Sequence, residues 1–258
     1  MDPVKCEIKD GLASITLNRP KVYNSINRAM ALELQTVLKE CAEDDTVRVV
    51  LITGAGKAFC AGQDLNEVTA GHGPSIIDIV STHYNPIVRG IIRMEKPVVA
   101  AINGVAAGAG LNLALCCDLV IAKQGVRLIQ GFGKIGLIPD SGGTFTLPRL
   151  IGLQRSKALM FLNDFIMAEE AEQIGLIYQA VPEKEFGKAV KELCERLSQM
   201  ATRAIGLTKR ALNHSLKNDL DTQLGIEEQL QATASQTQDC QEGIQAFLEK
   251  RQAKFLGQ

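Results

Sequence analysis

Asp140 is the residue of this chain whose type and setting point most directly to chemistry. It lies in residues 136–144 (GLIPDSGGT), near the middle of a 258-residue chain. Two other glycine-punctuated segments precede it, at residues 58–65 (AFCAGQDL) and 103–110 (NGVAAGAG). Turns built from small residues let a ligand approach backbone N–H groups closely. Backbone donors that face one lone acid suit the movement of a proton next to a carbonyl group.

Each segment also has a purely structural interpretation. Glycines in 103–110 could equally serve tight packing of a helix on a strand, and their spacing is not the Gly-x-Gly-x-x-Gly of a dinucleotide site. Residues 59–65 follow a buried strand, where open α/β folds bind ligands, but a plain turn with Asp64 capping a short helix is the simpler interpretation. On pattern alone, Asp140 is expected to cap the helix that leads to Leu150, and Tyr84 to be an ordinary core residue rather than a pocket wall.

Composition excludes several classes of function. The 28 basic and 29 acidic residues nearly balance, so no nucleic-acid or membrane-surface footprint is expected. The seven cysteines are scattered without Cys-x-x-Cys pairs or Cys/His clusters, which disfavours a metal site and a disulfide framework. No signal peptide is recognisable, and the longest apolar run, near Val98, is interrupted at Asn103. We expect a cytoplasmic protein without membrane spans.

Strands and helices are expected to alternate in the first half of the chain. The expected elements are a hairpin of strands at 4–8 and 13–17, a helix that begins after Asn27, a buried strand at 47–53, a loop and helix over 66–90, a buried strand at 97–103, a helix at 108–117 and a strand at 118–123. This alternation predicts parallel βαβ units. From about residue 141 onward helices dominate, with one strand near 177–181. The prediction is a core at 1–200 and a helical region at 201–258.

Four segments, taken together and in this order, carry a family resemblance: residues 17–20 (LNRP), 58–65, 103–110 and 136–144. Over nearly its full length the chain resembles the enoyl-CoA hydratase/isomerase (crotonase) superfamily. Within it, the closer likeness is to bacterial isomerases that act on a ring epoxide in phenylacetate catabolism. The resemblance implies an α/β fold, a crotonase-like spiral of ββα units with a helical C-terminal trimerisation region. It also implies a homo-oligomer, either a trimer or a dimer of trimers.

The resemblance further assigns roles to individual residues. The backbone N–H groups of Gln63 and Ala109 would form an oxyanion hole for an acyl-CoA thioester, and Asp140 would be the catalytic base. Coenzyme A would be part of the substrate, with no separate cofactor and no metal. The residues expected to bind the substrate are Lys21, Val22, Ala61, Asp64, Leu65, Gly110, Phe132, Leu137, Lys254 and Phe255, the last two from a neighbouring subunit.

The departures from the family pattern narrow the chemistry. Hydratases of this family use two glutamates, and the corresponding positions here hold Asn112 and Phe132, neither of which can act as a general base. One carboxylate is enough for isomerisation, and apolar neighbours would raise the pKa of Asp140. The resemblance therefore implies conversion of 1,2-epoxyphenylacetyl-CoA to the oxepin thioester, with 3-enoyl-CoA to 2-enoyl-CoA isomerisation beside it.

Alternatives remain open at the level of sequence. The chain could be a hydratase by another route, which would add one water to its substrate. It could use Asp140 as a nucleophile, as a dehalogenase or hydrolase does, which would leave a covalent adduct. It could also be a silent binder of CoA thioesters, which would bind without turnover. An NAD-dependent oxidoreductase is the least supported alternative.

Overall fold

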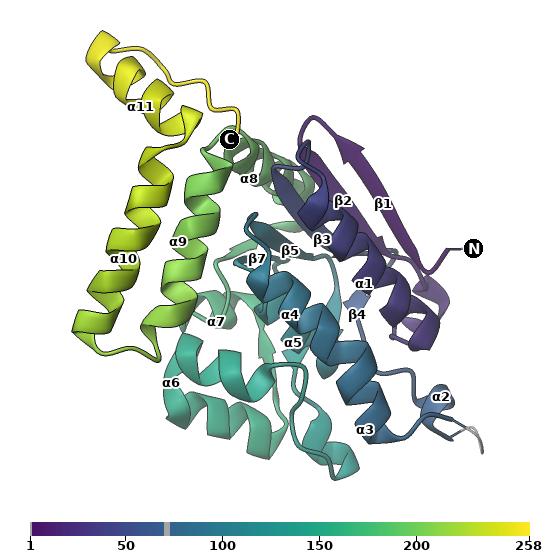
Figure 1. Ribbon diagram of the computed structural model, residues 1–258. Helices are drawn as coiled ribbons and strands as arrows, with labels where there is room; N and C mark the ends of the chain where they lie inside the picture. Colours follow the sequence, from purple (N-terminus) through teal and green to yellow (C-terminus); the bar gives the residue numbers. More distant parts are fainter. Residues whose placement is uncertain (1, 70–72) are drawn as a thin grey trace.

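Six strands form the larger of two sheets in the computed structural model, which describes residues 2–69 and 73–258 (Figure 1). The strand order is β1-β2-β3-β5-β7-β10. β1 and β2 form the predicted antiparallel hairpin, in which Asp10 and Gly11 both have positive φ, and the other neighbours in this sheet are parallel. The strands are β1 (Val4–Lys9), β2 (Leu12–Leu17), β3 (Val49–Gly54), β5 (Val98–Ile102), β7 (Leu119–Lys123) and β10 (Gln179–Val181).

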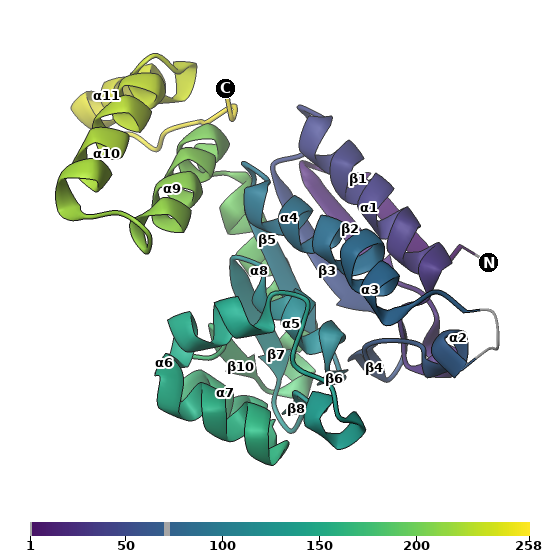
Figure 2. The ribbon, with the colours of Figure 1, turned by 60° about the horizontal axis from the view of Figure 1, so that its bottom comes forward.

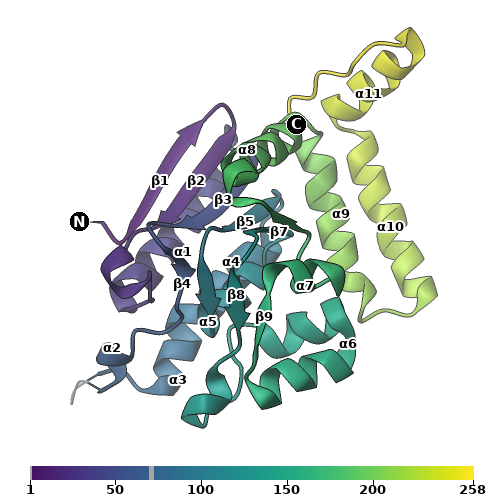
Figure 3. The same cartoon turned by 180° about the vertical axis from the view of Figure 1, so that it is seen from behind.

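A second sheet of four short strands lies beside the first (Figures 2 and 3). Its order is β4 (Ala58–Cys60), β6 (Val105–Ala107), β8 (Arg127–Ile129) and β9 (Phe165–Met167). Along the chain β3 is followed by β4, β5 by β6, and β7 by β8, and helical structure follows each pair. This alternation between two sheets is the spiral of ββα units that the sequence resemblance implied.

The expectation of a single strand after residue 141 was wrong, because β9 lies there as well as β10. β4, β6 and β8 were also not predicted as strands. Each of the four strands in the second sheet has three residues. Three residues are too few to show the alternation of apolar and polar side chains by which a strand is recognised in a sequence.

Helices cover both faces of the six-stranded sheet. α1 (Arg28–Glu43) begins as predicted after Asn27, whose Oδ1 accepts the Met30 N–H at 3.1 Å. It packs beside α4 (Asn85–Arg93) over one face of the sheet (Figure 2). α8 (Glu183–Ser198) covers the other face, where Val99 and Ile121 of the sheet and Phe186 of α8 belong to one apolar cluster. Burial on both faces explains why β3 and β5 read as continuous apolar runs.

The segment between β4 and α4 is more helical than the sequence predicted. It contains α2 (Leu65–Thr69), α3 (Ile76–Asp78) and a π-helical segment, η2 (Ile79–Tyr84), which runs directly into α4. The prediction of a loop and helix over 66–90 also covers residues 70–72, which lie outside the described residues. π-helical segments are rare and occur often at functional sites.

The C-terminal helices lie to one side of the two sheets (Figures 1 and 3). α6 (Gly143–Leu162) lies between β8 and β9, and α7 (Ala168–Gln173) follows β9. The chain ends with α9 (Thr202–Ser215), α10 (Leu220–Ser235) and α11 (Gln238–Glu249). Large apolar side chains on these last helices are exposed, including Leu212, Leu224, Phe247 and Leu248. Across residues 2–69 and 73–258, every helix is too short or too polar to cross a bilayer.

Candidate active site

A cavity of about 400 Å³ brings together residues from the three glycine-punctuated segments and from the π-helical segment. Its wall is mainly apolar, with contributions from α2, η2 and the short helix η3 (Phe132–Ile135). The apolar side chains include Leu65, Val68, Ile79, Phe132, Ile135 and Leu137. The polar side chains on the wall belong to Gln63, Tyr84, Gln130 and Asp140. Asp140 is the one acid among the described residues that line this cavity.

Asp140 occupies the short connection between η3 and α6. The prediction that it caps the following helix was wrong: α6 begins at Gly143, and its cap residue is Gly142, with φ of 81° and no side chain to cap the helix. The carboxylate instead accepts a hydrogen bond at Oδ1 from the Ser141 hydroxyl, at 2.8 Å. Burial raises the pKa of Asp140, and the Ser141 bond opposes this in part. The side chain is therefore free to act as a base.

Asn112 and Phe132 take different places around Asp140. Asn112 is fully buried on α5 (Ala109–Leu115), where its Nδ2 donates to the Asp140 carbonyl oxygen at 2.8 Å. Phe132 is buried in the cavity wall. Neither side chain can take up a proton from water, as the sequence predicted. The cavity thus offers one carboxylate instead of two.

The backbone N–H of Gln63 points away from Ile26, with which Gln63 forms an isolated parallel β-bridge. Gly62 and Asp64 make the two bonds to Ile26, at 2.7 and 2.9 Å, which leaves the Gln63 N–H on the opposite side of the extended chain. Gln63 also lines the cavity, so this N–H is available to a ligand. This arrangement is the one an oxyanion donor requires.

Ala109 supplies a second backbone donor beside Gln63. It is the first residue of α5, so its N–H has no acceptor within the helix. Gly62 has φ of 92°, and a Cβ there would lie 3.0 Å from the Ala107 carbonyl oxygen and 3.4 Å from the Ala109 nitrogen. Only glycine lets the two segments approach this closely. The structure therefore brings both predicted donors and Asp140 to the wall of one cavity.

Tyr84 is a functional candidate that the sequence pattern did not favour. Its side chain is buried and lines the cavity, and its hydroxyl donates to the Gln63 Oε1 at 2.8 Å. Gln63 Nε2 in turn donates to the Glu67 carboxylate at 3.0 Å. Burial, with smaller effects from Cys60 and Asp140, raises the pKa of Tyr84 well above its usual value. A buried tyrosine that remains protonated therefore holds the side chain of a predicted oxyanion residue.

The structure separates the other predicted substrate-binding residues into two groups. Ala61, Leu65, Phe132 and Leu137 line the cavity. Four others do not belong to its wall: Lys21, Val22, Asp64 and Gly110. Lys21 and Val22 lie in a short helix, η1 (Pro20–Val22), and Lys21 is exposed.

Asp64 and Gly110 have structural contacts that account for their types. Asp64 pairs with Arg19 at 2.8 Å and accepts the Asn66 N–H at 3.2 Å, so the alternative of a helix cap is confirmed for this residue. Gly110 packs α5 on β4, since a Cβ there would lie 2.5 Å from the Cys60 carbonyl oxygen. Both residues therefore stabilise segments next to the cavity without lining it.

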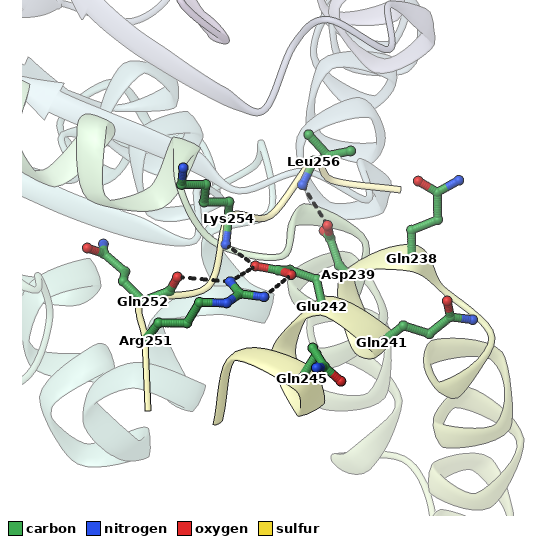
Figure 4. A pocket seen from close by; sticks show the side chains of 9 residues that line it. All are labelled: Gln238, Asp239, Gln241, Glu242, Gln245, Arg251, Gln252, Lys254 and Leu256. Atoms are coloured by element: carbon green, nitrogen blue, oxygen red, sulfur yellow. Dashed lines mark hydrogen bonds and ion pairs between the residues drawn. The ribbon is translucent and has the colours of Figure 1, made fainter. Parts of the chain in front are cut away.

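Lys254 and Phe255 lie in the tail beyond α11, and neither residue lines the cavity. The tail folds back on α11 (Figure 4): Glu242 accepts the Lys254 N–H at 2.8 Å and both Arg251 amino groups, and Asp239 accepts the Leu256 N–H at 2.6 Å. These contacts fix the tail backbone on its own helix. A contact between Lys254 and substrate would therefore have to involve the cavity of a neighbouring subunit.

Comparisons with known proteins show which family the chain belongs to. The family model described as "Enoyl-CoA hydratase/isomerase" matches residues 7–258. The 1,2-epoxyphenylacetyl-CoA isomerase of Escherichia coli (strain K12) is 42% identical over 260 residues, which cover 100% of this chain and 99% of that protein. The crotonyl-CoA hydratase of Syntrophomonas wolfei is 35% identical, with 97% of this chain and 96% of that protein covered.

Solved structures show the same fold. The crystal structure of an enoyl-CoA hydratase from Bacillus anthracis superimposes with a TM-score of 0.92 at 35% identity, covering 99% of this chain and 100% of that one. Sequence and structure therefore agree over the whole chain. The protein belongs to the enoyl-CoA hydratase/isomerase family.

Proposed function

We propose that this protein is an acyl-CoA isomerase that works with Asp140 as its single base. The observation that carries the proposal is the content of the cavity, which holds one carboxylate, Asp140, and two backbone donors, at Gln63 and Ala109. Asn112 and Phe132 supply no second acid or base for the addition of water. One base that removes and returns a proton is sufficient for isomerisation.

The roles follow from the charges that develop during the reaction. The thioester oxygen accepts hydrogen bonds from the Gln63 and Ala109 N–H groups, which stabilise the enolate as it forms. Loss of one such donor in an enzyme costs about 3 kcal/mol of transition-state stabilisation. Asp140 removes the proton beside the carbonyl group and delivers it to the far end of the dienolate. Burial that raises the pKa of Asp140 strengthens it as a base.

The proposed natural substrate is a ring epoxide, 1,2-epoxyphenylacetyl-CoA, which Asp140 helps to open and expand to the oxepin. Two observations support this finer proposal. The E. coli relative at 42% identity carries the name of that isomerase. The cavity wall presents apolar surfaces from Leu65, Ile79 and Phe132, which suit a six-carbon ring better than a polar acyl group.

A comparison of two substrates tests this proposal. We expect kcat/KM to be at least tenfold higher for 1,2-epoxyphenylacetyl-CoA than for a 3-enoyl-CoA, each followed by liquid chromatography of the product thioester; tenfold corresponds to about 1.4 kcal/mol. Asp140→Asn should abolish both reactions, and Asp164→Asn, which changes an exposed aspartate, should abolish neither. A higher value for the 3-enoyl-CoA would overturn the finer proposal. Absence of both reactions from the wild type would overturn the isomerase assignment.

A further inference from the structure

A chain of two buried amides leads from Gln130, on the cavity wall, to Asp140. Gln130 Nε2 donates to Asn112 Oδ1 at 3.0 Å, and Asn112 Nδ2 donates to the Asp140 carbonyl oxygen at 2.8 Å. Asn112 is fully buried and Gln130 is 2% exposed. The three residues come from α5, from the segment after β8 and from the connection before α6. The chain thus links the base to two separate turns of the spiral.

The orientation of both amides follows from the end of this chain. A backbone carbonyl can only accept, so the Asn112 group that faces Asp140 must be the NH₂. Asn112 Oδ1 then faces Gln130, which must donate with its own NH₂. Gln130 Oε1 is left buried without a partner among the described residues, an arrangement that costs free energy. An apolar residue at position 130 would avoid that cost but would leave Asn112 without its donor.

The loop that carries Asp140 also rests directly on Asn112. A Cβ at Gly143 would overlap the Asn112 amide, and the Gly143 N–H donates to the same Asp140 carbonyl oxygen at 2.9 Å. Asp140 is therefore held through its backbone by two donors, one from each side. Its carboxylate accepts a hydrogen bond from the Ser141 hydroxyl and remains available for the reaction.

We infer that Asn112 and Gln130 are positioning residues that fix the base of this isomerase, an inference that rests on the proposed role of Asp140. Asn112 acts by donating to the backbone of Asp140, and Gln130 acts by orienting Asn112. A carboxylate at position 112 would place acceptor against acceptor at the Asp140 carbonyl oxygen. Position 112 can therefore hold either an amide that positions Asp140 or an ionised acid, but an ionised acid there cannot position Asp140.

The first test removes the donor from position 112. Asn112→Leu keeps the number of side-chain heavy atoms and loses the amide, and we expect kcat for a 3-enoyl-CoA to fall about 10²-fold, the scale of loss for a base displaced by about 1 Å, while KM changes less than threefold. Asn18→Leu is the matched control, since Asn18 is also buried and donates by Nδ2 to a backbone oxygen, that of Asp2, at 2.9 Å. That variant should keep kcat within twofold.

The second test separates positioning from packing. Asn112→Asp can donate when its carboxyl group is protonated, so its kcat relative to that of Asn112→Leu should rise as the pH falls. A role in packing alone predicts a constant ratio. Gln130→Met leaves Asn112 in place and should lower kcat about tenfold, which keeps the inference testable where Asn112 variants fold poorly.

The outcomes distinguish this inference from the proposed function. Wild-type isomerisation that Asp140→Asn abolishes, together with full activity of Asn112→Leu and Gln130→Met, would overturn the positioning role alone. A pH-independent ratio between the two Asn112 variants would also overturn it. Isomerisation that survives in Asp140→Asn would overturn both the base assignment and the inference that rests on it.

Discussion

At Asp140, burial disfavours the charged form of the carboxyl group, and the Ser141 hydroxyl and the backbone N–H of Asp140 itself favour it. The described residues place no lysine or arginine on the cavity wall to pair with this carboxylate. A carboxylate in such a position accepts a proton more readily, and its burial in the charged form lowers the stability of the fold. This balance has consequences for activity and for stability that can be measured separately.

Activity should depend on pH through Asp140. The base must be deprotonated, so kcat/KM should fall as the pH decreases through the pKa of Asp140, which burial raises from its ordinary value. Ser141→Ala removes a hydrogen bond that lowers this pKa, so the inflection should move to higher pH. Ser156→Ala, which removes a serine bonded to its own helix, should leave the inflection unchanged. An inflection that stays in place or moves to lower pH in Ser141→Ala would contradict this account of the base.

The contribution of Asp140 to the free energy of unfolding should decrease as the pH rises, whereas kcat/KM should increase. Because the pKa of Asp140 is raised in the folded state, the folded protein binds more protons at this group, and its contribution to stability decreases as the pH rises. Asp140→Asn should therefore unfold at a higher urea concentration than wild type at pH 7, and the difference should vanish near pH 4 and below. Asp164→Asn should show no such difference. Equal midpoints at neutral pH for wild type and Asp140→Asn would argue against the burial cost.

Tyr84 should contribute to catalysis through Gln63. Tyr84→Phe keeps the buried ring and removes the bond to Gln63 Oε1, so kcat/KM should fall about tenfold. Tenfold corresponds to about 1.4 kcal/mol, which is within the net contribution of one hydrogen bond. The exposed Tyr178 offers a control, and Tyr178→Phe should leave kcat/KM unchanged. Wild-type kinetics in Tyr84→Phe would show that the Gln63 side chain needs no such support.

Among the elements, the contact between the 61–63 turn and the start of α5 is sensitive to a single methyl group. Gly62→Ala would place its Cβ 3.0 Å from the Ala107 carbonyl oxygen and separate the two proposed oxyanion donors. We expect kcat/KM to fall by a factor of about 10² to 10³. The measurement is the initial rate with a 3-enoyl-CoA.

Gly125→Ala is the matched control for this prediction. Gly125 has φ of 76°, and no atom lies within 4 Å of the position that a Cβ would take there, so the substitution carries the same kind of backbone strain without the close contact. It should lower stability by about 1 kcal/mol and leave kcat/KM unchanged. Equal losses of activity in the two variants would assign the effect to backbone strain in general and not to the oxyanion site.

How far the sequence predicts an element depends on its length and on its local signals. The hairpin around Asp10 and Gly11 and the helix after Asn27 were predicted because turn and cap residues mark them directly. The three-residue strands of the second sheet and the π-helical segment carry no such signal. They are fixed by the elements that pack against them.

In the candidate site, too, some residues were predicted from the sequence and others were not. Asp140, Gln63 and Ala109 were assigned through motifs that stand in single segments, and the structure brings them to one cavity. The bonds of Asn112 with Gln130 and of Tyr84 with Gln63 join segments 18 and 21 residues apart. Such contacts depend on the path of the whole chain and could not be predicted from the spacing of residues.

At the scale of the whole molecule, the exposed apolar side chains of α9, α10 and α11 are the feature that a single chain leaves unexplained. Leu212, Leu224, Phe247 and Leu248 are each at least half exposed. Apolar surfaces of this kind commonly mark contacts with other chains. They support a contact between copies of the chain, and the family resemblance predicts that the copies form a trimer or a dimer of trimers.

Light scattering coupled to size exclusion tests this prediction. The mass should be three or six times that of the 27.9 kDa chain, and Phe247→Ser, at an 83% exposed position, should lower it. Ile8→Ser changes an exposed apolar residue on β1 and should leave the mass unchanged. A wild-type mass of one chain at micromolar concentration would show that these helices do not form a stable contact between copies.

The central claim, isomerisation by one base, is tested most directly by the mass of the product. Wild type and Asp140→Asn would be incubated with a 3-enoyl-CoA and the thioesters separated by liquid chromatography with mass detection. Isomerisation by Asp140 alone predicts a wild-type product of unchanged mass with its double bond conjugated to the thioester, and no such product from Asp140→Asn. A wild-type product that has gained one water, or an unchanged rate in Asp140→Asn, would contradict it.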